Sequence, residues 1–508
     1  MLTELEATAE PQPVPLAALV GRWITAHLTV ISSLVGLCLV LGVVGAVYAP
    51  TLHDSFHGDD YVAFTEFRSK SFGTYVSDVF HFKDANFYWR PLGKILHYAL
   101  FDSFGFDPFA FRLTALLMFL GTLSGVYFFC LGERLGHWTA LAAAAILGLM
   151  PSHVVSVTWV TNTSRLQAGL FCILCLVLLQ QARKSRFPIA WEALALIVFV
   201  GAPLSDETAI ALAPIPVLYA TFVRDDRMHW RGAFLRGICY ALLAAAVIPP
   251  QFANTLNDEP RLTLYGFGPH IITQTWVLAS QLVLPIAEAN PVDVMITTIP
   301  PLEWAAGLAA IAGGAVLLIV GSRLVRFLVI WTAVSIAPFT LWDLQYTSPR
   351  YVYLAAIPFA ILAAWAAVKL AAVVAELTAR PQVAPRVIRF AAAGVAVVGV
   401  YFLFQLSAET TQARNAVWSQ ETAKYGVLAH QLEIELPRLP SGSRVVVFYA
   451  DWPDFWASST ARSVYGDRTV QVMGIPHERI EGPPILLRPN DHVFYLMGDR
   501  LMPSLLKR

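Results

Sequence analysis

Long apolar segments recur along almost the whole chain, and this feature limits what the chain can fold into. The first reads LTVISSLVGLCLVLGVVGAVYAP, at residues 28–50. A helix needs about 20 apolar residues to cross a bilayer core about 30 Å thick, and many segments qualify. Of the 508 residues, 56% are hydrophobic and only 14% are charged. The sequence therefore predicts a polytopic α-helical membrane protein instead of a soluble chain of two or three domains.

Eleven membrane spans are expected from these segments. They lie near residues 29–49, 109–131, 138–157, 166–182, 188–203, 207–223, 234–252, 303–321, 324–342, 351–376 and 388–406. With this number and a cytoplasmic N-terminus, four basic loops face the cytoplasm: QQARKSRF, RDDRMHWRGAFLR, SRLVR and ARPQVAPRVIR. A twelfth span at 270–287 would move the last two loops to the other side, against the positive-inside rule. We therefore interpret 270–287 as an interfacial or re-entrant helix.

The charge pattern divides the chain into three parts. Residues 1–28 form a cytoplasmic tail without the basic region and cleavage site of a signal peptide, so the first span is interpreted as a retained anchor. Residues 29–406 form the transmembrane domain, with a large external loop at 51–108. Residues 409–508 form a small extracytoplasmic α/β domain. In it, the helical pattern AETTQARNAVWSQETAKYGVLAHQLEIEL precedes the strand patterns SRVVVFYA, RTVQVM and HVFYLMGD.

Composition argues against several kinds of function. The 35 basic and 35 acidic side chains balance, so nucleic acid is not an expected partner. The C-terminal part contains neither a glycine-rich nucleotide loop nor a cluster of metal ligands. A disulfide framework is not expected either, because the cysteines all lie in apolar segments. They are Cys38, Cys130, Cys172, Cys175 and Cys239.

Aromatic residues are frequent in the external loop. Tyr61, Phe64 and Phe67 recur at three-residue spacing, which predicts a helix with these rings on one face. Rings on a helix at a membrane surface commonly lie at the depth of the lipid headgroups. We therefore expect this helix to lie in the interface, with the aromatic residues as membrane anchors that have no chemical role.

Two adjacent carboxylates follow the first span, in the stretch HDSFHGDDYVAFTEF. An acidic pair such as Asp59 and Asp60 most often caps a helix, because an Asp side chain accepts hydrogen bonds from the N–H groups of the first turn. The alternative is that one carboxylate acts as a base. Adjacent residues on a helix point about 100° apart, so the two cannot serve equally in that role.

Polar residues at the ends of other spans fall on the same predicted side as this pair. They are Arg90 in FYWRPLGKILHY, His153 in MPSHVVSVTWVTNTSR, Asp206 and Glu207 in LSDETAIALAP, and Arg350 in YTSPRYVYLAAIP. Each has a structural explanation: the arginines can extend to the interface, Asp206 can cap the next helix, and His153 can be hydrogen-bonded at a helix end. Ionisable residues near membrane segments are nevertheless often functional. Their common side indicates one external cavity.

The order of these motifs resembles the GT-C glycosyltransferases, in particular the branch of protein O-mannosyltransferases. The resemblance covers residues 50–370: the acidic pair, then YWRPL, PSHVVSVTWV, SDETAIALAP and SPRYVYL. Each motif is short, and the ordered set carries the specificity. The chain departs from the family at Asp206–Glu207, where relatives commonly have a Lys-Glu pair.

The resemblance implies an enzyme that moves a sugar, with a mannose-like hexose favoured, from a polyprenyl phosphate to an acceptor hydroxyl outside the cytoplasm, with inversion. Asp59, the first acid of the pair, is then the expected catalytic base, and Asp60 orients the acceptor or caps the helix. Arg90 and Arg350 are expected at the lipid phosphate, because a guanidinium binds phosphate through two hydrogen bonds. The other substrate-binding candidates are Tyr351, His153, Asp206 and Glu207.

The resemblance also implies partners and a location. These are the bilayer, the lipid-linked sugar and an acceptor that is a protein, a lipid or a glycan, at a bacterial inner membrane. No metal ligand is assigned, and a divalent cation is the one cofactor left open.

Two other kinds of function stay open. A transporter or flippase with an acidic pathway would have its acids along a through-path, and such proteins often show inverted repeats. A non-catalytic assembly subunit on a degenerate GT-C scaffold would lack space for a phosphate between the acid pair and Arg350.

Overall fold

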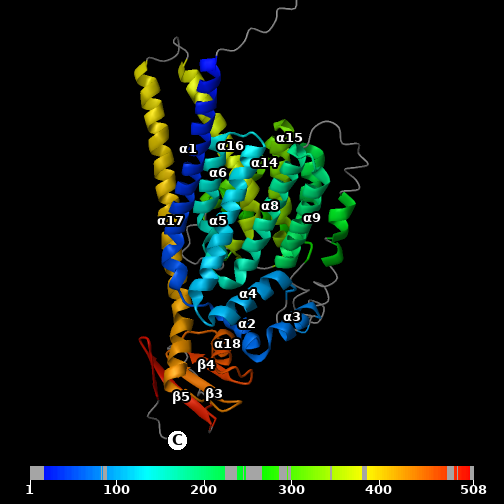
Figure 1. The fold of residues 1–508 in the computed structure, drawn as a ribbon. Helices are drawn as coiled ribbons and strands as arrows, with labels where there is room; N and C mark the ends of the chain where they lie inside the picture. Colours follow the sequence, from blue (N-terminus) through cyan, green and yellow to red (C-terminus); the bar gives the residue numbers. More distant parts are fainter. Residues whose placement is uncertain are drawn as a thin grey trace, which may run out of the picture.

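The computed structural model describes residues 16–81, 83, 88–223, 237–243, 245–247, 266–284, 294–295, 299–343, 346–379, 386–476, 486–488 and 490–503. It consists of a helical bundle with a small α/β domain at one end (Figure 1). The elements of the bundle up to α10 are α1 (Leu16–Tyr48), η1 (Ala49–His53), α2 (Gly58–Ser69), α3 (Phe72–Phe80), α4 (Pro91–Phe104), α5 (Pro108–Gly132), α6 (His137–Leu149), η2 (Pro151–His153), α7 (Val154–Thr158), η3 (Val160–Asn162), α8 (Thr163–Lys184), α9 (Pro188–Ser205), η4 (Glu207–Leu212) and α10 (Pro214–Leu218).

The second half of the bundle leads into the terminal domain. Its elements are η5 (Tyr219–Val223), α13 (His270–Val283), β1 (Val294–Met295), α14 (Pro301–Val320), α15 (Arg323–Thr340), β2 (Tyr346–Thr347), η7 (Pro349–Val352), α16 (Tyr353–Ala379) and α17 (Arg386–Glu435). The terminal domain adds β3 (Arg444–Phe448), α18 (Asp454–Tyr465), β4 (Gln471–Ile475), β5 (Asp491–Met497) and β6 (Arg500–Pro503). The chain is thus a polytopic helical membrane protein with a C-terminal α/β domain.

Within the described residues, seven helices are long and apolar enough to cross a membrane. An eighth candidate is α6 with the segment Pro151–Thr158, which is bent by 52° at the break between them. The bend falls where Pro151 cannot donate a backbone hydrogen bond to continue α6. The count of eleven spans stays a prediction. The N-terminal residues 1–15 lie outside the described residues, and so do 234–236, 244 and 248–252 of the seventh predicted span, 234–252.

Two predicted segments take unexpected or shortened forms. The sixth predicted span, 207–223, is divided into a 3-10 helix, the short α10 and a π-helix. Pro214 and Pro216 stand in α10, and each removes one backbone donor. In the predicted interfacial segment, α13 has 14 residues, which extend about 21 Å at 1.5 Å per residue. This is less than the thickness of a bilayer core and agrees with a segment that does not cross; residues 285–287 lie outside the description.

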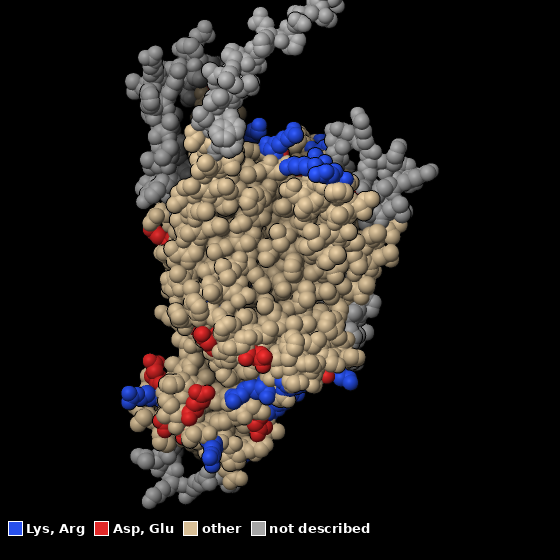
Figure 2. All heavy atoms as spheres, viewed as in Figure 1, with Lys and Arg blue, Asp and Glu red and all other residues tan. Residues whose placement is uncertain are grey.

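The surface of the bundle is suited to lipid. Large apolar side chains on α1, α14 and α16 are exposed, and Figure 2 shows a wide band almost free of charge across the face of the bundle in that view. Lys and Arg gather at the upper end in that view, whereas both signs of charge occupy the lower end with the α/β domain. The basic residues Arg183 and Lys184 end α8, and Arg323 begins α15.

The external loop folds into α2, α3 and α4 beneath the bundle (Figure 1). Tyr61, Phe64 and Phe67 of α2 are at most 4% exposed, so the prediction that they anchor the protein at lipid headgroups is wrong. They pack with Tyr75 and Phe111 in one aromatic cluster. The three-residue spacing correctly indicated a helix with one aromatic face, but other parts of the chain cover that face instead of lipid.

The helix α17 joins the bundle to the α/β domain. Its 50 residues extend about 75 Å at 1.5 Å per residue, and it runs without a break through the predicted domain boundary near 406–409. The terminal sheet has the order β4-β3-β5-β6, with β3 parallel to β4 and β5, and β6 antiparallel to β5. Leu428 and Leu432 of α17 pack with Val445, Val447 and Ala457 in the core of this domain. The three predicted strands are all present.

We predict that the α/β domain lies outside the cytoplasm, as the basic loops indicate. A Ser441→Cys variant, with its thiol in an exposed turn, is expected to react with a membrane-impermeant thiol reagent in intact cells. Ser322→Cys, at the start of α15, is the matched variant and is expected to react only after lysis. The unmodified protein gives the background of its five cysteines. Labelling of Ser441→Cys only after lysis would contradict the predicted sidedness.

Candidate active site

One cavity collects most of the polar residues that the sequence places outside. It has a volume of about 640 Å³ and lies among α2, α8, η4, α15 and η7. Its charged lining residues are Asp59, Arg90, Arg165, Glu207 and Arg350. Its other lining residues, mainly apolar or aromatic, are Tyr88, Trp159, Thr161, Asn162, Thr208, Ile210, Ala211, Ala337, Pro338, Phe339, Leu341, Trp342 and Tyr351. Five of the predicted site residues therefore share this cavity: Asp59, Arg90, Glu207, Arg350 and Tyr351.

The two acids of the pair have different surroundings. Asp60 is 2% exposed. Its Oδ2 accepts a hydrogen bond from the backbone N–H of His57 at 2.9 Å, and its Oδ1 accepts bonds from the N–H of Thr161 at 2.9 Å and from the Thr161 hydroxyl at 2.6 Å. Asp59 is half-buried and lines the cavity. Asp60 thus caps α2 and ties it to η3, while Asp59 is the acid that meets the cavity.

Arg112 of α5 fixes the chain on either side of this capping site. Its guanidinium donates to the carbonyl oxygens of Asp54 at 3.0 Å, Ser55 at 2.5 Å and Thr158 at 2.5 Å. The residues that lead into α2 are therefore held against the end of α7. A buried guanidinium needs several acceptors, and here these are backbone carbonyls of two segments that are distant in sequence.

His57 begins α2 as a neutral ring. Burial, together with the positive charges of Arg350, Lys424 and Arg112, lowers its pKa to about 3. A neutral imidazole can accept a hydrogen bond, and Nδ1 of His57 accepts one from the backbone N–H of Asp59 at 3.3 Å. The backbone of the candidate base is thus held by the residue that caps its helix.

Two carboxylates neutralise part of the positive charge at the far side of the cavity. Nε and Nη2 of Arg90 donate to the two carboxylate oxygens of Glu207 at 2.5 and 2.6 Å. Asp206 is fully buried, with its Oδ2 3.6 Å from Arg90 and 3.4 Å from Arg165. Arg90, Arg165 and Arg350 thus stand on the same side of the cavity as the carboxylates of Asp206 and Glu207.

Arg350 and Arg165 lie against aromatic rings. The guanidinium carbon of Arg350 is 4.5 Å from the centre of the Trp159 ring, and that of Arg165 is 5.2 Å from the Phe339 ring. Tyr351 stacks on Phe339 with 4.6 Å between ring centres. Aromatic faces attract guanidinium groups and restrict their motion, so the two cations are oriented along the cavity wall.

Besides Asp60, two predicted site residues do not line the cavity. Asp206 lies behind the arginines and accepts a hydrogen bond from the N–H of Thr208 at 3.0 Å, so it caps η4. The ring of His153 is fully buried between Phe119 and Tyr353, at 5.8 and 5.3 Å between centres. Neither position is suited to contact a substrate in the cavity.

Arg165 was missed at the level of sequence. It stands near the start of a long apolar segment, and a single arginine at such a place is a recognised signal of function. Arg165 ends the motif MPSHVVSVTWVTNTSR, so this signal is present in the sequence. Trp456 of α18 was missed because it lies 397 positions from Asp59, to whose Oδ1 it donates a hydrogen bond of 2.8 Å. No local pattern indicates such a contact.

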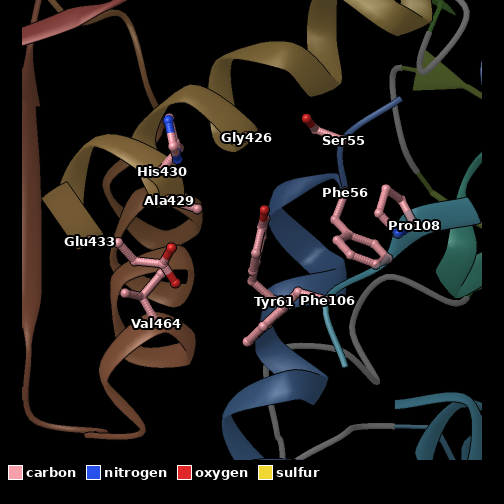
Figure 3. A pocket seen from close by; sticks show the side chains of 10 residues that line it. All are labelled: Ser55, Phe56, Tyr61, Phe106, Pro108, Gly426, Ala429, His430, Glu433 and Val464. Atoms are coloured by element: carbon pink, nitrogen blue, oxygen red, sulfur yellow. The ribbon is translucent and has the colours of Figure 1, made fainter. Parts of the chain in front are cut away.

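A smaller cavity of about 210 Å³ opens on the other face of α2. Figure 3 shows Tyr61 and Phe106 facing Ala429, His430 and Glu433 of α17 across it. Tyr61 follows Asp59 by two positions, which is about 200° around a helix. Asp59 therefore points away from this smaller space.

The residues of the main cavity do not fit a divalent cation. Carboxylate oxygens are the ligands that such cations prefer, and Asp206 and Glu207 both bind arginines here. Among the residues that the structure describes, no three His, Cys, Asp or Glu side chains are grouped so that they could hold a metal ion.

No family model matches the sequence, and no curated protein matches it. Solved structures do resemble it. One is an oligosaccharyltransferase of Archaeoglobus fulgidus with a tethered acceptor peptide, at 12% identity and a TM-score of 0.49, over 87% of this chain and 64% of that one. The chain thus spans less than two thirds of that protein. ArnT of Cupriavidus metallidurans is similar in its apo state, at 16% identity and 0.47, over 86% and 85%, and with bound undecaprenyl phosphate, at 15% and 0.45, over 84% and 85%.

The buried carboxyl of Asp60 predicts a pH-dependent stability. Burial raises its pKa from 3.8 to about 6, although the bonds from Thr161 and His57 act in the opposite direction. The folded state binds this proton more tightly than the unfolded state. The stabilisation of the folded protein that comes from the protonated Asp60 carboxyl is therefore fully present below about pH 4 and is lost as the pH rises through about 6. Thermal unfolding in detergent between pH 4 and 7 measures it. Asp60→Asn cannot ionise and is expected to flatten this slope; an unchanged slope in that variant would reject the assignment.

Proposed function

We propose that this protein is a GT-C-type glycosyltransferase that moves a sugar from a polyprenyl phosphate to an acceptor hydroxyl. The observation that carries the proposal is that Asp59 lines the same cavity as Arg350 and Arg165. A base for the acceptor and cations for the donor phosphate are the two requirements of this transfer. The cavity has a volume of about 640 Å³, which falls within the roughly 300–1,000 Å³ of small-molecule sites.

The proposed transfer is a single displacement at the anomeric carbon. The acceptor oxygen forms a bond to that carbon while the bond from the carbon to the phosphate oxygen breaks, and the lipid phosphate leaves with the bonding electrons. Asp59 takes the proton of the acceptor hydroxyl. Arg350 and Arg165 stabilise the negative charge on the departing phosphate. One displacement from the opposite face inverts the anomeric configuration.

The ion pairs of Arg90 argue against the role at the lipid phosphate that the sequence suggested for it. Its fork already binds Glu207, so we assign Arg90 to holding the cavity wall and Arg350 with Arg165 to the phosphate. Tyr351 and the other aromatic residues suit a sugar ring and the first isoprene units. Asp60 orients Asp59 through the start of α2, and Asp206 and His153 act as buried structural residues.

Finer features of the proposal come from the sequence resemblance. They are a mannose-like hexose, the protein O-mannosyltransferase branch, and a bacterial inner membrane with the α/β domain outside. The alternative of an assembly subunit is disfavoured because Asp59 and Arg350 line one cavity of about 640 Å³. The alternative of a transporter is disfavoured because the acids line a cavity near α2, at the end of the bundle, instead of the middle of its spans.

The proposal predicts that Asp59→Asn abolishes most transfer. Membranes that contain the protein are incubated with radiolabelled polyprenyl-phosphate mannose, and label in acceptor material is counted. Loss of a positioned general base lowers the rate about 10²- to 10⁴-fold, whereas Asn preserves the shape of the side chain. Parallel incubation with the glucose-linked lipid tests the choice of sugar.

Asp60→Asn is the matched variant for this experiment. It keeps an oxygen that can accept from Thr161, and we expect it to lower stability more than the rate. Normal transfer by Asp59→Asn with an inactive, folded Asp60→Asn would exchange their roles. Transfer by both variants at the rate of the parent would reject the proposed enzyme.

The cations predict a second set of variants. Arg350→Lys and Arg165→Lys are expected to weaken binding of radiolabelled polyprenyl phosphate to the purified protein roughly 10- to 100-fold, because hydrogen bonds to charged groups contribute about 1.5–3 kcal/mol and an ammonium lacks the planar fork. Arg90→Lys is the control, expected to lower the thermal unfolding temperature with a smaller effect on binding. Equal binding by Arg350→Lys and the parent would remove Arg350 from the phosphate site.

A further inference from the structure

The α/β domain lies directly against the helix that carries the acid pair. Figure 1 shows α18 beside α2 at the lower end of the bundle. Arg68, near the end of α2, donates to the carbonyl oxygen of Ser463 at 3.0 Å and also to that of Val464. Glu66 forms an ion pair with Arg468 at 3.1 Å. These contacts hold the C-terminal end of α2 on the terminal domain.

At the start of α2, the contact is closer still. A Cβ atom on Gly58 would lie 2.4 Å from Cβ of Trp456 and 2.6 Å from its Cγ, so only glycine allows the indole to approach the backbone here. The ring centre of Trp456 is also 4.7 Å from that of His57. The indole is therefore fixed by packing on both residues that precede the acid pair.

This packing directs the indole N–H at the candidate base. Nε1 of Trp456 donates to Oδ1 of Asp59 at 2.8 Å. An indole N–H is a donor only, so it cannot take the acceptor's proton itself. It can orient the carboxylate, and because it binds the charged form it favours the ionised acid that a base requires.

We propose that Trp456 is a positioning residue for Asp59, so that the terminal α/β domain completes the active site. This inference rests on the proposed function, in which Asp59 is the base. The domain then has a role in the transfer itself. Any change that moves α18 away from α2 lowers the rate without touching the donor site at Arg350.

The other groups near Asp59 are constant in the experiment that follows. They include His57 at the start of the same helix, Tyr425 on α17, whose ionisation is opposed by the Asp59 charge, and Arg350, which lines the same cavity. A change in pH dependence on substitution of Trp456 therefore reports the loss of its own hydrogen bond.

The test compares Trp456→Phe with Trp452→Phe in the transfer assay. Both variants keep an aromatic ring, but Trp452 lies in the core of the terminal domain and away from the cavity lining. For Trp456→Phe we expect kcat to fall about 10- to 100-fold, as for a misplaced catalytic group. KM for the lipid donor should stay unchanged, and the acidic limb of the pH–rate profile should move to higher pH. Trp452→Phe should keep the parent's profile.

Gly58→Ala disturbs the same contact through a change on α2 instead of α18. Its methyl group displaces the indole, and a folded variant should show the same fall in kcat and the same movement of the profile. An unchanged profile in folded Trp456→Phe, or an equal loss in Trp452→Phe, would overturn the inference while Asp59→Asn stays inactive. If Asp59→Asn is itself active, the proposed function fails first, so the two failures are distinguishable.

Discussion

The hydrogen bonds that join Asp60 to Thr161 hold the candidate site together. They tie the first turn of α2 to η3, at the start of the helix that carries Arg165. Arg112 reinforces the same junction through backbone carbonyls on both sides. Asp59 precedes Asp60 on the same turn of α2, so this junction sets the direction in which the Asp59 side chain points. A buried carboxylate is costly unless its oxygens are all bonded, and here three donors meet it.

The opposite wall of the cavity depends on charge balance. Asp206 and Glu207 hold Arg90 and Arg165 in place, and removal of either acid would leave a guanidinium less compensated in a partly apolar setting. The relatives that the sequence resembles commonly have a Lys-Glu pair here. In this chain Asp206 stands at the place of the lysine, and Nε of Arg165 lies 3.4 Å from its carboxylate.

The long helix α17 gives the terminal domain a fixed place relative to this cavity. Its polar half is anchored on the bundle by Asn415, whose amide donates to the carbonyl oxygen of Val47 at 3.0 Å, and by Ser419, which donates to Asp54 at 2.5 Å. Further along, Leu428 and Leu432 enter the core of the domain. The same helix thus orients both the residues before α2 and the domain that supplies Trp456. Rigid attachment through a continuous helix explains how one indole can meet Asp59 from so distant a position in sequence.

Local patterns in the sequence were enough to predict many features of this protein. The length of the apolar segments predicted the membrane bundle, and short apolar runs between turns predicted β3, β4 and β5. The common side of the polar motifs predicted one cavity that Asp59, Arg90, Glu207 and Arg350 line, although Asp206 and His153, expected there for the same reason, do not. These features follow from the periodicity of helices and strands and from the free-energy cost of placing charge near lipid. Both can be read from residues that are close together in the sequence. The number of spans stays a prediction on the same basis.

Only the tertiary structure decided which of the two acids meets the cavity, because the rotation of α2 is set by Thr161 and Trp456, which lie far away in sequence. For the same reason it decided that the α2 rings are covered by protein instead of lipid. It also decided that Arg90 binds Glu207 while Arg165 joins the cavity wall. The type of a side chain determines which groups it can bind. Which of those groups it does bind depends on segments distant in sequence that the fold brings together.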